Sequence, residues 1–114
     1  MLRQRFGAAV RLNLRQEYEA LLGSKPVGRS RRFLVHVLPN AYSIARLGII
    51  VSKRTVPRAT RRNRLKRWVR EAFRHQQAQL AGLDLLVRVR EDATREEGLF
   101  VRQELTRLFS SLSK

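Results

Sequence analysis

The sequence predicts an α/β fold of the α+β kind, a single-domain sandwich in which helices pack on a mixed sheet. Three observations support this. Apolar residues recur at helical spacing in three segments, and they alternate at every second position in the segments between them. The 114 residues suffice for one modest core. The predicted order is helix, two or three strands, helix, strand, helix, and residues 1–114 form one domain.

The first predicted helix begins after Asn13, a residue type that often caps helix N-termini, and Gln16 stands at the matching position of a capping box. Its apolar side consists of Leu14, Tyr18, Leu21 and Leu22. Residues 23–30 contain two glycines and a proline, which predict a loop that ends this helix.

Strands are predicted at residues 33–38, 45–52 and 83–90 from their alternating pattern. The core-facing residues of the first are Phe33, Val35 and Val37, opposite Leu34, His36 and Leu38. In the second, the expected buried residues are Leu47, Ile49 and Val51. In the third they are Leu83, Leu85, Val87 and Val89. These faces need helices to cover them.

The helix predicted at residues 61–74 is the most informative part of the chain. Its apolar stripe consists of Leu65, Trp68, Val69, Ala72 and Phe73. A narrow arc on the opposite side holds Asn63, Arg67, Arg70 and Arg74. Glu71 is the only acid of the segment, so we favour binding of a polyanion over a solvated or membrane-surface helix. A last helix follows the capping box Thr94-x-x-Glu97, with its stripe at Val101, Leu105, Leu108, Phe109 and Leu112.

Composition points to nucleic acid. There are 25 Lys and Arg against 9 Asp and Glu, a net charge of +16, and arginine dominates. Its planar fork matches phosphate oxygens and stacks on bases. A hydrophobic content of 43% excludes a disordered basic tail. The chain has no cysteine, and no apolar run suggests a membrane span or a signal peptide, so we expect a cytoplasmic protein.

Several residues allow two interpretations. Trp68 lies mid-stripe, so core packing is favoured over base stacking. Tyr18 could belong to the core or line a groove. For His36 a neutral, partly buried ring is favoured over a stacking ring on an open sheet face. No paired carboxylates or metal-ligand spacing occur, and Asp84, Glu91 and Asp92 could hold Mg²⁺ only if the fold brought them together. We therefore expect a binding protein without catalytic residues or a metal of its own.

The segments RNRLKRWVREAFR (residues 62–74) and RLGIIVSKR (residues 46–54) resemble the protein component of bacterial ribonuclease P. Weaker similarities occur at residues 11–12, 17–18 and 82–87. The resemblance implies a left-handed crossover around the basic helix. It also implies a separate catalytic RNA that holds most of the Mg²⁺ and removes the 5′ leader of precursor tRNA.

The same resemblance implies two surfaces. The catalytic RNA would contact Lys53, Arg54, Arg61, Arg62, Asn63, Arg64, Lys66, Arg67 and Arg70. The single-stranded leader would lie in a groove formed by Tyr18, Leu22, His36, Arg46, Ser52 and Arg88. Leu22 and His36 stand where relatives often have aromatic residues, so this groove would either bind the leader less firmly or depend more on the charges of Arg46 and Arg88.

The expected partners are the ribonuclease P RNA subunit and precursor tRNA, with no membrane and no obligate protein partner. Two other functions remain open. One is a ribosomal or other structural RNA-binding protein, and the other is a free-standing nuclease that uses His36 or His75.

Overall fold

The computed structural model describes residues 11, 12 and 14–112 and contains one four-stranded sheet with three α-helices. The strands are β1 (Gly28–Arg29), β2 (Phe33–Pro39), β3 (Arg46–Ile50) and β4 (Leu83–Val89). The helices are α1 (Arg15–Leu22), α2 (Ala59–Gln76) and α3 (Gly98–Ser110), with 3₁₀ turns η2 (Gln77–Leu80) and η3 (Arg95–Glu97). The predicted fold class and element order are confirmed.

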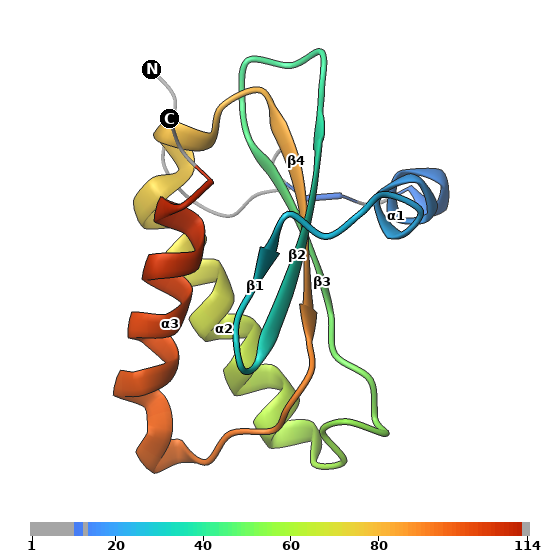
Figure 1. Ribbon diagram of the computed structural model, residues 1–114. Helices are drawn as coiled ribbons and strands as arrows, with labels where there is room; N and C mark the ends of the chain where they lie inside the picture. Colours follow the sequence, from blue (N-terminus) through green and yellow to red (C-terminus); the bar gives the residue numbers. More distant parts are fainter. Residues whose placement is uncertain (1–10, 13, 113–114) are drawn as a thin grey trace.

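The sheet is mixed, with strand order β1-β2-β4-β3. β2 runs antiparallel to β4, and β3 runs parallel to β4. A parallel pair needs a crossover connection, which here contains α2. Figure 1 shows α2 and α3 covering one face of the sheet and α1 on the other. The start of α2 and the end of β4 therefore lie at the same end of the molecule.

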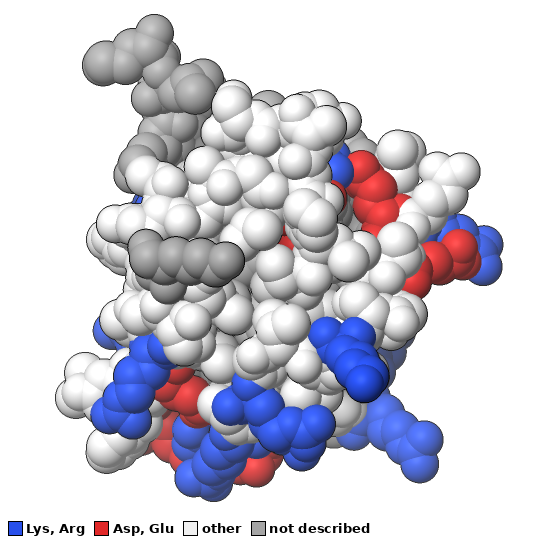
Figure 2. Space-filling view, turned by 45° about the horizontal axis from the view of Figure 1, so that its top comes forward, with Lys and Arg blue, Asp and Glu red and all other residues white. Residues whose placement is uncertain are grey.

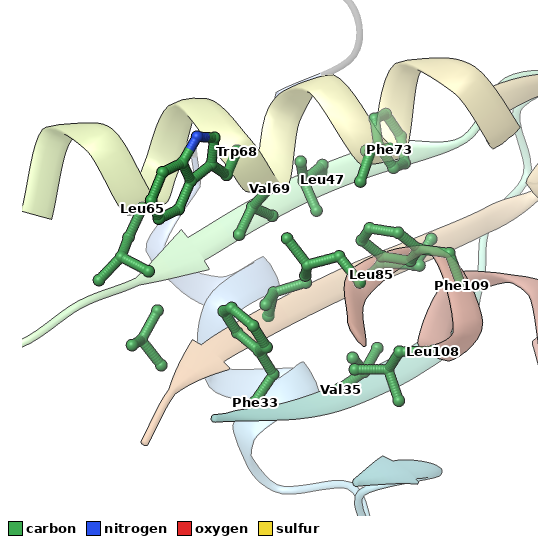
Figure 3. Close-up of a cluster of buried hydrophobic side chains, with 14 of the residues drawn as sticks. Phe33, Val35, Leu47, Leu65, Trp68, Val69, Phe73, Leu85, Leu108 and Phe109 are labelled. Atoms are coloured by element: carbon green, nitrogen blue, oxygen red, sulfur yellow. The ribbon is translucent and has the colours of Figure 1, made fainter. Parts of the chain in front are cut away.

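The main core lies between the sheet and the two longer helices (Figure 3). α2 contributes its predicted stripe, and Trp68 is only 3% exposed, which confirms its place in the core. Phe73 of α2 and Phe109 of α3 meet edge to face, with ring centroids 6.2 Å apart. Phe33 and Val35 of β2 are fully buried beneath them. The predicted periodicities of helix and strand thus converge on one interface.

A smaller core lies under α1 and contains Leu12, Leu21 and Leu86. The chain before α1 runs along the outer edge of β3, where Arg11 bridges Leu47 and the Leu12 N–H donates to the Leu47 carbonyl at 3.1 Å. This pairing anchors the segment that leads into α1.

Arg32 joins the turn between β1 and β2 to α3, although it is almost fully buried. Its guanidinium donates to Glu104 at 2.8 Å and to Glu97 at 2.9 Å. The backbone N–H of Arg32 also donates to Glu104, and the Ser30 hydroxyl bonds the same carboxylate. Burial lowers the pKa of Arg32, but the two carboxylates more than offset this and keep it above its usual value. The cluster fixes the β1–β2 turn against α3.

Three local predictions need correction. Gly28 and Arg29, predicted as loop, form β1 because they pair with Val35 and Leu34. The second predicted strand is shorter, since β3 covers only Arg46–Ile50. Asn13 lies outside the described residues, and the N-cap of α1 is Leu14.

The capping side chain of α1 also differs from the prediction. The Leu14 N–H donates to the carboxylate of Glu17 at 3.3 Å, so Glu17 has the role expected of Gln16. The capping box Thr94-x-x-Glu97 is confirmed, since the Thr94 N–H donates to Glu97 at 2.7 Å, but it caps η3, the 3₁₀ turn that leads into α3. In the described part of the chain, no helix has the length and apolar character that a membrane crossing requires.

Candidate nucleic-acid interface

The outward side of α2 carries the arc of polar residues predicted from the sequence. Asn63, Arg67 and Arg74 are exposed, and Arg70 is half-buried. Lys53 and Arg54, in the turn before α2, are also exposed. In Figure 2 the blue side chains crowd the lower part of the view, which is the end where Figure 1 places the start of α2. Above them the described surface is mostly white, apart from red and blue side chains toward the right.

The acidic residues do little to neutralise this surface. Seven of the nine Asp and Glu residues form ion pairs with arginines, and the exceptions are Glu71 and Glu96. In the part of the chain that the structure describes, these pairs involve five arginines, namely Arg15, Arg31, Arg32, Arg46 and Arg61. The exposed residues Lys53, Arg54, Arg67 and Arg74 are in none of these pairs. Clustered positive charge of this kind attracts polyanions.

Two of the predicted RNA contacts, Arg61 and Arg62, hold the fold together. Arg61 pairs with Asp92 at 3.0 Å, which ties α2 to the segment after β4. Arg62 donates to the carbonyls of Val56 and Pro57, both at 2.9 Å. Arg62 thereby ties α2 to the segment that directly follows the turn with Lys53 and Arg54.

The beginning of α2 adds a further positive end. Its N-cap is Arg58, which makes no capping side-chain bond, and its first turn contains no acid. The partial positive charge of the helix start is therefore not compensated there. Arg58 itself is exposed, and sequence reasoning missed it because it lies outside the periodic pattern of the helix.

Arg64 and Lys66 complete the predicted set and are half-buried on the flanks of α2. The guanidinium of Arg64 lies 5.8 Å from the centre of the Trp68 ring. The structure thus places the predicted residues on one helix and its leading turn, with Arg61 and Arg62 largely occupied by internal contacts.

The second predicted surface lies on the α1 side of the sheet. Tyr18 is half-buried there, and its side chain lies so close to Gly48 that a Cβ on this glycine would be 2.9 Å from two ring carbons and the hydroxyl oxygen. Burial raises the pKa of Tyr18, opposed by a hydrogen bond from the Ile49 backbone. Tyr18 therefore packs on the sheet and is still partly exposed, which is compatible with both interpretations of this residue.

His36 does not contribute to this surface, contrary to its inclusion in the predicted groove. The ring is 2% exposed, and its Nδ1 lies 3.0 Å from the backbone carbonyl of Ser24. A hydrogen bond to this carbonyl requires a proton on Nδ1. The alternative of a buried histidine is therefore correct.

Arg46 is also unavailable as a free charge. Its guanidinium donates to both oxygens of Asp84 and, at 2.7 Å, to Glu17. Hydrogen bonds to Asp84 raise the pKa of Arg46 against the opposing effect of burial. The Tyr42 ring lies 4.5 Å from the same guanidinium. Together with Glu17 and Asp84, these residues line a pocket of about 350 Å³ beside α1, in which one guanidinium faces two carboxylates.

The open part of this sheet face lies at the opposite end from Arg46. Arg88 of β4 is exposed, and its neighbours in register are Leu34 of β2 and Ile50 of β3, both half-buried. We call Tyr18, Leu34, Ile50 and Arg88 the α1-side patch. Leu34 and Ile50 were missed as site residues, although the strand alternation places them on this face.

Leu22 and Ser52, the remaining predicted groove residues, are exposed. The Ser52 hydroxyl contacts that of Thr55 at 3.0 Å and accepts the Thr55 N–H at 3.1 Å, which shapes the turn after β3.

The carboxylates considered for Mg²⁺ are not brought together. Asp84 binds Arg46, Glu91 binds Arg31 and Asp92 binds Arg61. Within residues 11, 12 and 14–112, no group of three or more potential ligands is close enough to hold a metal ion.

Comparisons with known proteins agree with this architecture. The solved RNase P protein from Thermotoga maritima has a TM-score of 0.71, is 30% identical, and the match covers 91% of this chain and 98% of that one. The RNase P protein from Staphylococcus aureus has a TM-score of 0.71 at 26% identity, with 97% and 92% covered. The fold is thus the one shared by these solved RNase P proteins.

The sequence comparisons identify the family. A family model described as Ribonuclease P matches residues 6–113. The ribonuclease P protein component of Azoarcus sp. (strain BH72) is 38% identical over 109 residues, which cover 96% of this chain and 91% of the relative. That of Pseudomonas aeruginosa (strain LESB58) is 33% identical, with 98% and 84% covered. The chain belongs to the ribonuclease P protein family, which confirms the resemblance found in its sequence.

Proposed function

We propose that this protein is the protein subunit of ribonuclease P, which binds the catalytic RNA and the 5′ leader of precursor tRNA and thereby promotes removal of the leader. The observation that carries the proposal is the outward side of α2, where Arg67 and Arg74 are exposed and take part in none of the ion pairs found among the described residues. Because the chain belongs to the ribonuclease P protein family, we assign the ribonuclease P RNA as the partner of this surface.

The catalytic RNA is assigned to α2 and the turn before it. Exposed Lys53, Arg54 and Arg67 can neutralise phosphates, and each neutralised phosphate releases condensed counterions. Arg61 and Arg62 act indirectly. Arg61 fixes α2 to Asp92, and Arg62 holds the segment after the turn through the carbonyls of residues 56 and 57. Positioning of this kind reduces the entropy lost on binding.

The leader is assigned to the α1-side patch. A single strand can stack a base on the exposed part of Tyr18, pack another against Leu34 or Ile50, and place a phosphate near Arg88. Leu22 and Ser52 lie at the margins of this path. The α1-side patch contains one aromatic ring, that of Tyr18, so we expect weak binding of individual bases and little sequence preference.

The chemistry is assigned to the RNA subunit, with Mg²⁺ held mainly by that RNA. In such a site metal ions activate water and stabilise the leaving oxygen. The protein contributes binding energy away from the scissile bond, which helps to position precursor tRNA in the active site. The proposed role is therefore that of an accessory subunit of an endoribonuclease.

Reconstitution tests the proposal directly. The purified protein is added to a bacterial ribonuclease P RNA at low Mg²⁺, and cleavage of precursor tRNA is followed. The expected result is a marked gain in cleavage with the correct 5′ end. Binding of the RNA without any gain would instead support a structural RNA-binding protein.

The protein alone, stringently freed of RNA, is the matching control. We expect it to leave precursor tRNA intact. Cleavage that persists in the protein alone and is lost in His75→Ala, whose parent side chain is exposed, would support the free-standing nuclease and contradict the proposal.

A further inference from the structure

Two arginines from different helices converge on one indole ring. The guanidinium carbon of Arg64, on α2, lies 5.8 Å from the centre of the Trp68 ring, and that of Arg102, on α3, lies 5.9 Å from it. Within the part of the chain that the structure describes, no carboxylate lies within ion-pair distance of either guanidinium. Both charges are therefore free to meet a ligand.

The convergence follows from the spacing of residues on the two helices. Arg64 and Trp68 are four residues apart on α2, and Gly98 and Arg102 are four apart on α3, so each pair shares a helix side. A Cβ at Gly98 would lie 2.9 Å from Cζ2 of Trp68. The missing side chain thus lets the start of α3 rest on the indole. This close approach brings Arg102 to the same ring as Arg64.

The indole also orients the two arginines. A guanidinium near an aromatic ring is attracted by the ring's electron density, and its N–H groups can still point outward. Such an arrangement restricts the long side chain before a ligand arrives. Trp68 itself is almost fully buried, so it supports the arginines and is not available to stack on a base.

The pair adjoins the surface already assigned to RNA. Arg64 lies about 60° around α2 from Arg67, counting about 100° per residue. Arg102 is exposed on the neighbouring helix. The cationic surface therefore continues from the outward side of α2, past its flank, onto α3.

We infer that Arg64 and Arg102 together bind backbone phosphates of the catalytic RNA, so that the RNA interface extends from α2 onto α3. The inference rests on the proposed function for the identity of the RNA. Guanidinium forks bind phosphate oxygens in pairs, which suits a folded RNA backbone better than an uncharged or apolar partner. Arg102 is thus an RNA-binding residue on an element outside the basic helix.

The first experiment compares Arg102→Ala with Arg107→Ala, which also removes an exposed arginine from α3 but about 140° around the helix. Affinity for a bacterial ribonuclease P RNA is measured over a range of salt concentrations. We expect Arg102→Ala to flatten the logarithmic salt slope by about one unit and Arg107→Ala to leave it unchanged. Arg102→Lys should keep the slope but weaken binding, because it retains the charge and loses the fork.

The second experiment needs no catalytic RNA. Trp68 is the only tryptophan of the chain, so its fluorescence reports on the site. Inorganic tripolyphosphate is titrated into the wild type, Arg102→Ala and Arg107→Ala. We expect a saturable change in emission for the wild type and Arg107→Ala, and its loss in Arg102→Ala. Circular dichroism checks that all three variants are folded.

The outcomes separate this inference from the proposed function. If Arg67→Ala flattens the salt slope and Arg102→Ala does not, the extension onto α3 is wrong while RNA binding by α2 stands. If the wild type stimulates no cleavage, the proposed function fails, and the tripolyphosphate titration still decides the anion site. An equal response of the wild type and Arg102→Ala to tripolyphosphate overturns the site.

Discussion

Arg46 and Asp84 form a two-armed ion pair across the neighbouring parallel strands β3 and β4, with Nε–Oδ1 at 2.9 Å and Nη2–Oδ2 at 2.8 Å. Both side chains are 12% exposed. The pair also reaches α1, because Arg46 contacts Glu17, and the β2–β3 turn, because Asn40 donates to Asp84 at 2.8 Å. It is a structural joint between four segments of the chain.

Replacement of Arg46 should therefore affect stability more than RNA binding. Arg46→Met leaves the buried Asp84 carboxylate without its cation, and we expect the free energy of unfolding to fall by about 3–5 kcal/mol. Urea denaturation measures this. The double variant Arg46→Met/Asp84→Leu, which removes both charges, should recover much of the loss. An Arg46→Met protein as stable as the wild type would show that the pair contributes nothing.

Replacement of Arg67 should have the opposite profile. Arg67 is exposed on the outward side of α2, so Arg67→Ala should change the free energy of unfolding by no more than about 0.5 kcal/mol. It should weaken assembly with the catalytic RNA and flatten the logarithmic salt slope by about one unit. Arg107→Ala is the matched control. A slope that stays at the wild-type value would exclude Arg67 from the interface.

Tyr18 tests the leader surface. Tyr18→Ala should lower the affinity of the holoenzyme for precursor tRNA by about 1–3 kcal/mol, the range for one stacked base, and leave mature tRNA binding unchanged. Tyr18→Phe keeps the ring and should behave like the wild type. Equal losses for precursor and mature tRNA would argue against a leader site at Tyr18.

Glu97 makes the fold sensitive to acid. Hydrogen bonding from the Thr94 backbone, together with Arg32, lowers the pKa of Glu97 below its usual value. The folded state therefore binds the proton of Glu97 less readily than the unfolded chain. Its stabilising contribution is complete above the unfolded pKa and is lost as pH falls through the lowered folded pKa. Urea unfolding between pH 6 and pH 3 should show a shallower acid decline for Glu97→Gln, and curves of equal steepness would contradict this.

Gly98 tests the contact between α2 and α3. Alanine favours a helix over glycine by about 1 kcal/mol at most, whereas overpacking against the buried Trp68 ring costs about 1–3 kcal/mol. We therefore expect Gly98→Ala to destabilise the protein and to shift the emission of its single tryptophan. The same substitution at Gly23, which has 3.4 Å or more to its nearest neighbours, is the control.

Periodicity predicted the elements that bury a continuous apolar stripe. The stripe through Leu65, Trp68 and Phe73 and the alternation through Phe33 and Val35 both lie in the core. The resemblance to the family, together with charge, placed Arg67 and its neighbours on one surface. These features depend on local spacing, which a sequence displays directly.

Features that depend on distant partners could not be predicted in this way. Arg46 was predicted to act as a charge in the leader groove but pairs with Asp84. This pairing could not be predicted because Asp84 lies 38 residues further along the chain. His36 is sealed by a carbonyl from the segment after α1, and β1 exists because Gly28 meets Val35. The buried Arg32 had no local signal, since its partner Glu104 is 72 residues away.

The pairing of Arg11 and Leu12 with β3 has a consequence for self-association. An uncovered strand edge offers a ladder of free N–H and C=O groups on which other chains can assemble. Here that segment shields one margin of the sheet, and the strand at the other margin, β1, is only two residues long. Protein that is not bound to RNA therefore exposes little strand edge on which fibrils could grow. Molecules with a net charge of +16 also repel one another, which further opposes aggregation.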